Sequence, residues 1–172
     1  MANDSWRTPP EIFNHYNKRF DFALDVAASD DNHLCRNYIT KEQDALTTSW
    51  NEAASDYIFG RYVWCNPPYS NPLPFVSRAI YYSRQGVGSV FLLNHDMSVE
   101  WSKMLVRYAS ELHVFIASGS KEDKTYRNGR IAFLGDDGQP IHGNTKGQVV
   151  AIIPPFSHGI SHPVTHYMTL PK

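Results

Sequence analysis

Long apolar runs are missing from this 172-residue chain. No stretch approaches the roughly 20 apolar residues that a membrane-spanning helix needs, and the N-terminal region lacks the apolar centre of a secretion signal. Cysteine is also scarce: Cys35 and Cys65 are too few for a disulfide framework. We therefore expect a cytoplasmic protein without a membrane segment, and the length fits a single domain over residues 1–172.

An excess of charge of either sign is missing as well. The formal net charge is −1, from 16 basic and 17 acidic residues, so the chain lacks the overall positive charge of many nucleic-acid-binding proteins. A local basic segment can still hold phosphates, because an acidic surface elsewhere cancels it in the sum. Residues 121–130, KEDKTYRNGR, form such a segment, although a solvated loop has the same composition. Composition alone therefore leaves a nucleic-acid partner open.

Apolar periodicity predicts alternating helices and strands. Helical spacing of apolar residues marks residues 8–20, 73–86 and 98–109. Short apolar runs mark strands at residues 22–29, 34–40, 62–65, 89–94, 112–117, 130–135 and 147–155. This alternation indicates an α/β fold with a mostly parallel sheet, which the last two strands would close in antiparallel fashion. The segment from residue 158 onward has no periodicity, and we expect it to lie irregularly over the surface.

The segment VWCNPPYS, residues 63–70, places an asparagine, two prolines and a tyrosine directly after a predicted strand. Ligands of open parallel sheets bind beyond the carboxyl ends of the strands, where Asn66 would lie. The Asn66 side-chain oxygen and the Pro67 carbonyl oxygen offer two acceptors at a separation that the prolines restrict, and Tyr69 offers a flat apolar ring. This set suits a planar amine, since accepting both of its hydrogens directs the nitrogen lone pair at an electrophile.

Asn66, Pro67, Pro68 and Tyr69 resemble the (N/D/S)PP(Y/F/W) motif of amino-group methyltransferases that use S-adenosylmethionine, and the NPPY form is typical of adenine-N6 enzymes. Nearly the whole chain is similar to small phage and prophage DNA adenine methyltransferases of the Dam type. The resemblance implies a reduced, Rossmann-like class I methyltransferase fold with the four motif residues as the catalytic set. It also implies S-adenosylmethionine as cofactor and an adenine flipped out of double-stranded DNA as substrate.

The resemblance further implies where the cofactor binds. The residues that it indicates are Trp6, Thr8, Pro9, Asp25, Ala27 and Asp44. The first three belong to a segment similar to the N-terminal TPP motif, which holds the methionine part of the cofactor. Asp25 would face the cofactor ammonium group, and Asp44 would bind its adenine amine. The usual glycine-rich turn is replaced by Ala27 and its neighbours, which limits how closely the backbone can approach the cofactor.

Recognition of a DNA sequence requires side chains that reach base edges, and arginine and lysine contact guanine most often. The candidates in this chain are Lys121, Lys124, Arg127, Asn128 and Arg130. No separate recognition domain is visible, which predicts a short target or loose specificity. A GATC-like target is compatible with the resemblance.

Three alternatives compete with this interpretation. The same tetrapeptide occurs in methyltransferases of release-factor glutamine amides and ribosomal RNA guanine amines, which usually keep a glycine-rich first motif and extra substrate domains. A non-catalytic relative that only binds DNA would also tolerate the missing glycines. His158, His162 and His166 are spaced four apart, as zinc ligands can be, but Gly159 and Pro163 interrupt any helix that would align them. We expect no metal.

Overall fold

The computed structural model describes residues 4–55, 58–141, 143–159 and 162–172. Its helices are α1 (Pro10–Phe20), α2 (Trp50–Ala53), α3 (Leu73–Ser83) and α4 (Glu100–Tyr108). Its strands are β1 (Leu24–Ala28), β2 (Tyr38–Thr40), β3 (Tyr62–Cys65), β4 (Gly88–Asn94), β5 (Glu111–Phe115), β6 (Gln148–Ile153) and β7 (Val164–Met168). None of the helices in this described part combines the length and apolar character needed to cross a membrane.

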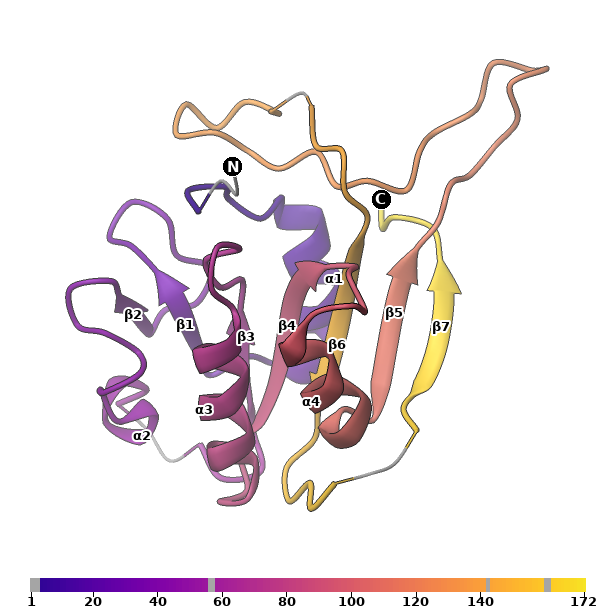
Figure 1. The fold of residues 1–172 in the computed structure, drawn as a ribbon. Helices are drawn as coiled ribbons and strands as arrows, with labels where there is room; N and C mark the ends of the chain where they lie inside the picture. The colour runs from indigo at the N-terminus through magenta and orange to yellow at the C-terminus, as the bar shows by residue number, and fades with distance from the viewer. Residues whose placement is uncertain (1–3, 56–57, 142, 160–161) are drawn as a thin grey trace.

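The strands of the described chain form one seven-stranded sheet in the order β2-β1-β3-β4-β6-β5-β7 (Figure 1). The neighbours β1 and β2, β1 and β3, β3 and β4, and β5 and β7 are parallel. Among these strands, only β6 is antiparallel to its neighbours, β4 and β5. The expected α/β fold with a mostly parallel sheet is confirmed, and this arrangement is consistent with a Rossmann-like methyltransferase.

Helices cover both faces of the sheet (Figure 1). On one face, Phe13 and Tyr16 of α1 pack with Trp64 of β3 in an aromatic cluster. On the other face, α3 and α4 contribute Val76 and Leu105 to a second apolar core. The central strands β4 and β6 are almost entirely buried, which explains why their sequences are continuous apolar runs rather than alternating ones.

The first helix begins at Pro10, within the predicted range. Pro9 is its N-cap and Pro10 takes the first helical position. A backbone N–H at that position has no acceptor within the helix, so proline loses no hydrogen bond there. The helix ends at Phe20 and is capped by Asp21, whose backbone is left-handed with φ 46° and whose N–H donates to the Asn17 carbonyl. Residues 4–9, called the N-terminal segment below, consequently lie across the carboxyl ends of the parallel strands (Figure 1).

Two expectations about the C-terminal half are wrong. Residues 130–135 form no strand: Leu134 makes only isolated bridges, to Arg7 and Pro140, because this loop passes over the end of the sheet instead of along its edge. The described part of the last segment is not irregular throughout, since Val164–Met168 form β7, which pairs in parallel with β5. The side chains of β7 are mostly exposed, so the strand carried no apolar signal in the sequence.

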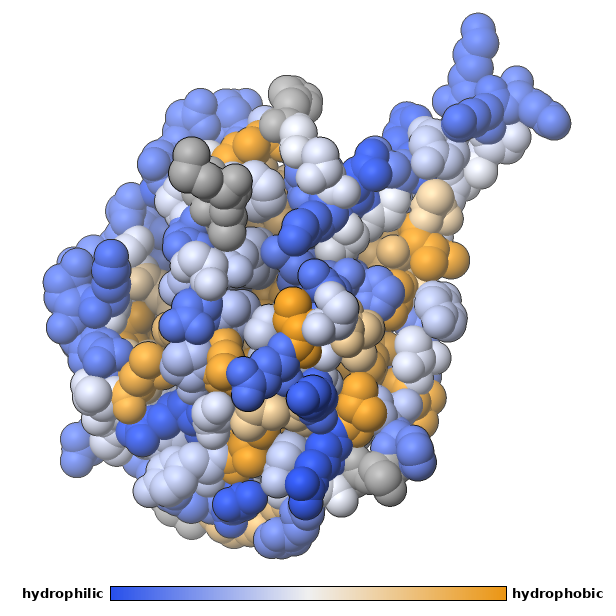
Figure 2. Space-filling model, viewed as in Figure 1, coloured by the Kyte–Doolittle hydropathy of each residue, from blue (hydrophilic) through white to orange (hydrophobic). Residues whose placement is uncertain are grey.

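Residues 116–130 leave the sheet after β5 as an arm (Figure 1). Its two sides pair through Ser118 and Arg127, whose backbones exchange two hydrogen bonds of 2.9 Å. At Gly129 an added Cβ would lie 2.5 Å from the Ile116 carbonyl carbon, so glycine permits this close approach. Figure 2 shows a hydrophilic arm tip that projects from the body of the molecule.

Candidate active site

A cleft lies beyond the carboxyl ends of β1 and β3, where the strand order changes direction. Its volume of about 750 Å³ is that of a small-molecule site. The charged residues on its wall are Asp4, Arg7, Asp31, Lys41, Asp44 and Asp136. Because carboxylates outnumber cations on this wall, the cleft favours a ligand that carries positive charge.

Asn66 follows β3 and lines this cleft. Its Nδ2 donates to the Trp6 carbonyl oxygen at 3.2 Å, which fixes the orientation of the amide. Its Oδ1 is buried and has no hydrogen-bond partner among the described residues. A buried acceptor left unpaired costs about 1–3 kcal/mol, so this oxygen is a place where the N–H of a ligand would be accepted.

Three aromatic rings, those of Trp6, Phe133 and the motif residue Tyr69, contact one another in series. Phe133, which is fully buried, stacks on Trp6 with ring centroids 5.2 Å apart and meets Tyr69 edge-on at 5.8 Å. The Trp6 indole N–H and the Tyr69 hydroxyl are buried without partners in the described chain. Burial raises the pKa of Tyr69 well above its ordinary value, so the hydroxyl stays protonated. The flat faces of these rings suit stacking with a planar ring.

The N-terminal segment joins the loops that surround the cleft. The Asp4 carboxylate accepts from the Ser70 backbone N–H at 2.9 Å and from the Ser70 hydroxyl at 2.6 Å. The Arg7 guanidinium donates to the Asp31 carboxylate at 2.7 Å and to that of Asp136 at 3.2 Å. Sequence reasoning missed these residues, and it also missed Phe133, which it placed in a strand. For two of these residues the sequence offered one signal, since Asp4 and Arg7 lie within two positions of Trp6, a predicted cofactor residue.

The predicted cofactor residues do not all lie in the cleft. Ala27 and Asp44 line the cleft. The Asp44 carboxylate accepts from two groups of the turn that follows it, which leaves further lone pairs for a ligand. Trp6 contributes its carbonyl to the orientation of the motif asparagine. Thr8 is buried, and Pro9 caps α1 and lines a groove beside the arm instead of the cleft.

Asp25 is buried within β1 and is only 3% exposed. Its carboxylate accepts from the Leu34 backbone N–H at 3.1 Å and from the Ala27 N–H at 3.3 Å. Burial raises the pKa of Asp25 to about 6 even though these two bonds oppose the shift. Asp25 thereby ties the end of β1 to the following loop, where the usual glycine-rich turn and helix are missing. Its predicted contact with the cofactor ammonium group stays a prediction.

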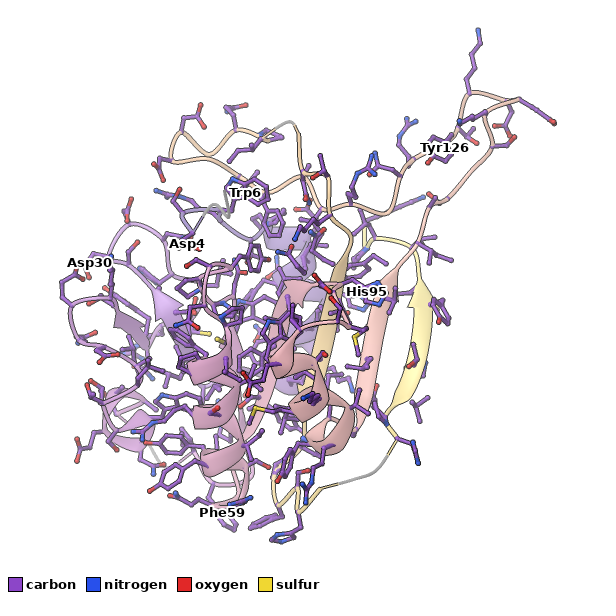
Figure 3. The ribbon with its side chains drawn as sticks, in the orientation of Figure 1. Asp4, Trp6, Asp30, Phe59, His95 and Tyr126 are labelled. Carbon is purple, nitrogen blue, oxygen red and sulfur yellow. The ribbon has the colours of Figure 1, made fainter. Side chains whose placement is uncertain are left out.

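The predicted DNA contacts lie on the arm and are exposed; they are Lys121, Lys124, Arg127, Asn128 and Arg130. Among the described residues, none of these four cations takes part in an ion pair. A groove of about 940 Å³ brings all of them except Lys121 together with the first turn of α1. Tyr126, also on the arm (Figure 3), lines the same groove. Unpaired positive charge along a groove suits a polyanion.

One group in the described chain has the chemistry of metal ligands: Glu111, His113 and His166, whose ligand atoms lie within 4.8 Å of one another. The Glu111 carboxylate already accepts from the Arg19 guanidinium and lies 2.9 Å from a ring nitrogen of His113. The other His113 ring nitrogen is 3.1 Å from the Tyr16 hydroxyl. These contacts tie α1 to β5 and occupy the carboxylate with protein donors.

Comparison with known proteins identifies the family of this chain. The model of the family DNA N-6-adenine-methyltransferase (Dam) matches residues 1–169. A DNA N-6-adenine-methyltransferase of Haemophilus phage HP1 is 39% identical over 156 residues, covering 88% of this chain and 79% of the relative. Another, from Escherichia phage T1, is 32% identical over 175 residues, covering 98% of this chain and 70% of the relative. The chain therefore belongs to the DNA N-6-adenine-methyltransferase (Dam) family.

Proposed function

We propose that this protein transfers a methyl group from S-adenosylmethionine to N6 of an adenine in double-stranded DNA. The family match and the two phage relatives support the reaction. The observation that carries the site assignment is the buried, unpaired Oδ1 of Asn66 on the wall of an acidic cleft. An acceptor in this position binds an amine hydrogen, which adenine N6 supplies.

The cleft fits the proposed cofactor in size and charge. S-adenosylmethionine carries a positive sulfonium and a positive ammonium group, which suit a wall with an excess of carboxylates. Asp44 accepts from the adenine amine of the cofactor, while Ala27 borders the cleft and Asp25 holds the adjoining turn. Trp6 and Thr8 of the N-terminal segment hold the methionine part. When bound, S-adenosylmethionine supplies an electrophilic methyl group.

The motif residues orient the target amine. The Asn66 Oδ1 and the Pro67 carbonyl each accept one N6 hydrogen, which turns the nitrogen lone pair toward the methyl donor without prior deprotonation. Pro67 and Pro68 restrict the backbone, so the two acceptors keep their separation. Tyr69 stacks on the adenine ring. Catalysis on this account comes from positioning and from the placement of polar groups.

An adenine within a duplex cannot reach such a site, so the target base is flipped out of the stack. The arm holds the DNA beside the cleft: Arg127, Asn128 and Arg130 contact base edges, while Lys121 and Lys124 contact phosphates. The exposed lysines and arginines of the arm, which form no ion pair with any residue that the structure describes, support this role. Since both relatives come from phages, the proposed place of action is the cytoplasm of a bacterial host.

The test is transfer of labelled methyl from S-adenosylmethionine to unmethylated plasmid DNA, with release factor and ribosomal RNA as competing acceptors. Nucleoside mass spectrometry should find N6-methyladenine in the DNA, and sequencing then gives the target word. Asn66→Ala should lower the rate by about 100- to 1,000-fold, which is typical for the loss of a polar group that acts in the transition state. Asn51→Ala, an exposed asparagine of α2, is the matched control.

Three outcomes would contradict the proposal. Label only in the release factor or the RNA would assign a different amine as substrate. Transfer to DNA that persists at full rate in Asn66→Ala would remove Asn66 from the site. Binding of cofactor and DNA without transfer to any acceptor would indicate a non-catalytic relative.

A further inference from the structure

We propose that Asp4 is a positioning residue for methyl transfer, which acts by holding the Trp6 carbonyl against Asn66. This inference rests on the proposed role of Asn66 as the acceptor of the target amine. Asp4 itself need not touch the adenine. Its effect is to determine that the Asn66 Oδ1, and not the Nδ2, faces the ligand.

The contact between Asp4 and the motif loop has two parts. One carboxylate oxygen accepts from the Ser70 backbone N–H, and the other accepts from the Ser70 hydroxyl. Ser70 directly follows Tyr69, so this pair of bonds fixes the backbone at the end of the motif. Hydrogen bonds to an ionised carboxylate are stronger than neutral ones, and two bonds to one residue also fix its orientation. We call this pair of bonds the Asp4 latch.

Two residues further along the N-terminal segment, the Trp6 carbonyl accepts from Asn66 Nδ2 at 3.2 Å. Figure 3 shows Asp4 and Trp6 near each other at the same end of the molecule. An amide can present either its oxygen or its NH2 group to the cleft. The Trp6 carbonyl selects the first orientation, because a carbonyl pairs with an NH2 group and repels an oxygen. With the opposite orientation, Asn66 would meet the target amine with a donor instead of an acceptor.

Other contacts keep the N-terminal segment on the body of the molecule when the latch is removed, but these contacts do not bind the segment to residues 66–70. Arg7 holds Asp31 and Asp136, and the Trp6 ring stacks on Phe133. Asp4, by contrast, is exposed, so its side chain adds little to the apolar core. Loss of the latch should therefore loosen the alignment of Trp6 and Asn66 while the fold persists. A misplacement of about 1 Å near reacting groups can lower a rate about 100-fold.

The experiment measures the single-turnover rate of methyl transfer to duplex DNA at saturating S-adenosylmethionine, together with thermal unfolding. Asp4→Ala should lower the rate by about 10- to 100-fold, with an unfolding temperature close to that of the unmodified protein. Asp4→Asn should stay within several-fold, because its amide can accept from the Ser70 N–H and donate to the hydroxyl. Ser70→Ala removes only the bond from the hydroxyl, so its transfer rate should lie between the rates of Asp4→Ala and Asp4→Asn. Glu100→Ala, which removes an exposed carboxylate of α4, serves as the control.

A double-variant cycle separates positioning from a general structural effect. If Asp4 acts through Asn66, Asp4→Ala should cause no further loss in an Asn66→Ala background, because residues that act as a unit are not additive. Independent losses that multiply would overturn the proposal, as would an Asp4→Ala rate equal to that of the unmodified protein while Asn66→Ala is inactive. Full activity of Asn66→Ala would instead overturn the proposed function. If Asp4→Ala fails to fold, Ser70→Ala in the presence and absence of Asn66→Ala provides the same comparison.

Discussion

The proposed stacking of adenine on Tyr69 gives a quantitative prediction for two variants. The Tyr69 hydroxyl is buried without a partner in the described chain, so Tyr69→Phe removes an unsatisfied polar group and should unfold at the same temperature or higher. Tyr69→Ala also removes the ring. That variant loses the edge contact with Phe133, worth about 0.5–1.5 kcal/mol beyond the buried area, so it should be less stable.

The functional cost of Tyr69→Ala follows from the lost stacking. Stacking of a base on an aromatic side chain is worth about 1–3 kcal/mol, which corresponds to about 5- to 150-fold in affinity for the flipped base. Affinity for a duplex with the target adenine should fall by this factor. Affinity for a duplex with an abasic site at that position should not change, because no base is there to stack.

The assay compares these two duplexes, built on the target word that plasmid methylation reveals, with saturating cofactor. Tyr69→Phe should match the unmodified protein on both duplexes and transfer methyl at a similar rate. Tyr81→Ala, an exposed tyrosine of α3, controls for the loss of a ring elsewhere. Equal loss of affinity on both duplexes in Tyr69→Ala, or no loss on either, would refute the stacking argument.

Three further predictions concern the cofactor, the arm and the buried carboxylate. Asp44→Ala should weaken S-adenosylmethionine binding by about 10- to 150-fold, because it removes one hydrogen bond to a charged group. Isothermal titration calorimetry measures this affinity, and an unchanged value would remove Asp44 from the site. Lys121→Ala and Lys124→Ala should each reduce the slope of log affinity for DNA against log salt by about 1 without altering the target word. Burial raises the pKa of Asp25 from 3.8 to about 6, so the folded protein keeps a proton that the unfolded chain releases over this range. The free energy of unfolding should therefore fall by about 3 kcal/mol in total as the pH rises from about 3 to 7, and Asp25→Asn should abolish this decrease in urea unfolding.

Several elements of the fold were predictable because their signals are local. The apolar run before Asn66, the helix after Pro9 and the central strands β4 and β6 each show a periodicity that their own side chains create. The strand β7 escaped prediction because it lies at the edge of the sheet and exposes most of its side chains.

By itself the sequence determined the α/β alternation, the position of NPPY after a buried strand, and the acceptor, proline and aromatic groups in that motif. These depend on residues adjacent in the chain. Only the tertiary structure decided which partners complete the site, because those partners are distant in sequence: Asn66 meets the Trp6 carbonyl across 60 positions, Ser70 meets Asp4 across 66, and Arg7 meets Asp136 across 129. No local pattern records such contacts, since they form only when the parallel sheet brings the loops at its carboxyl ends together.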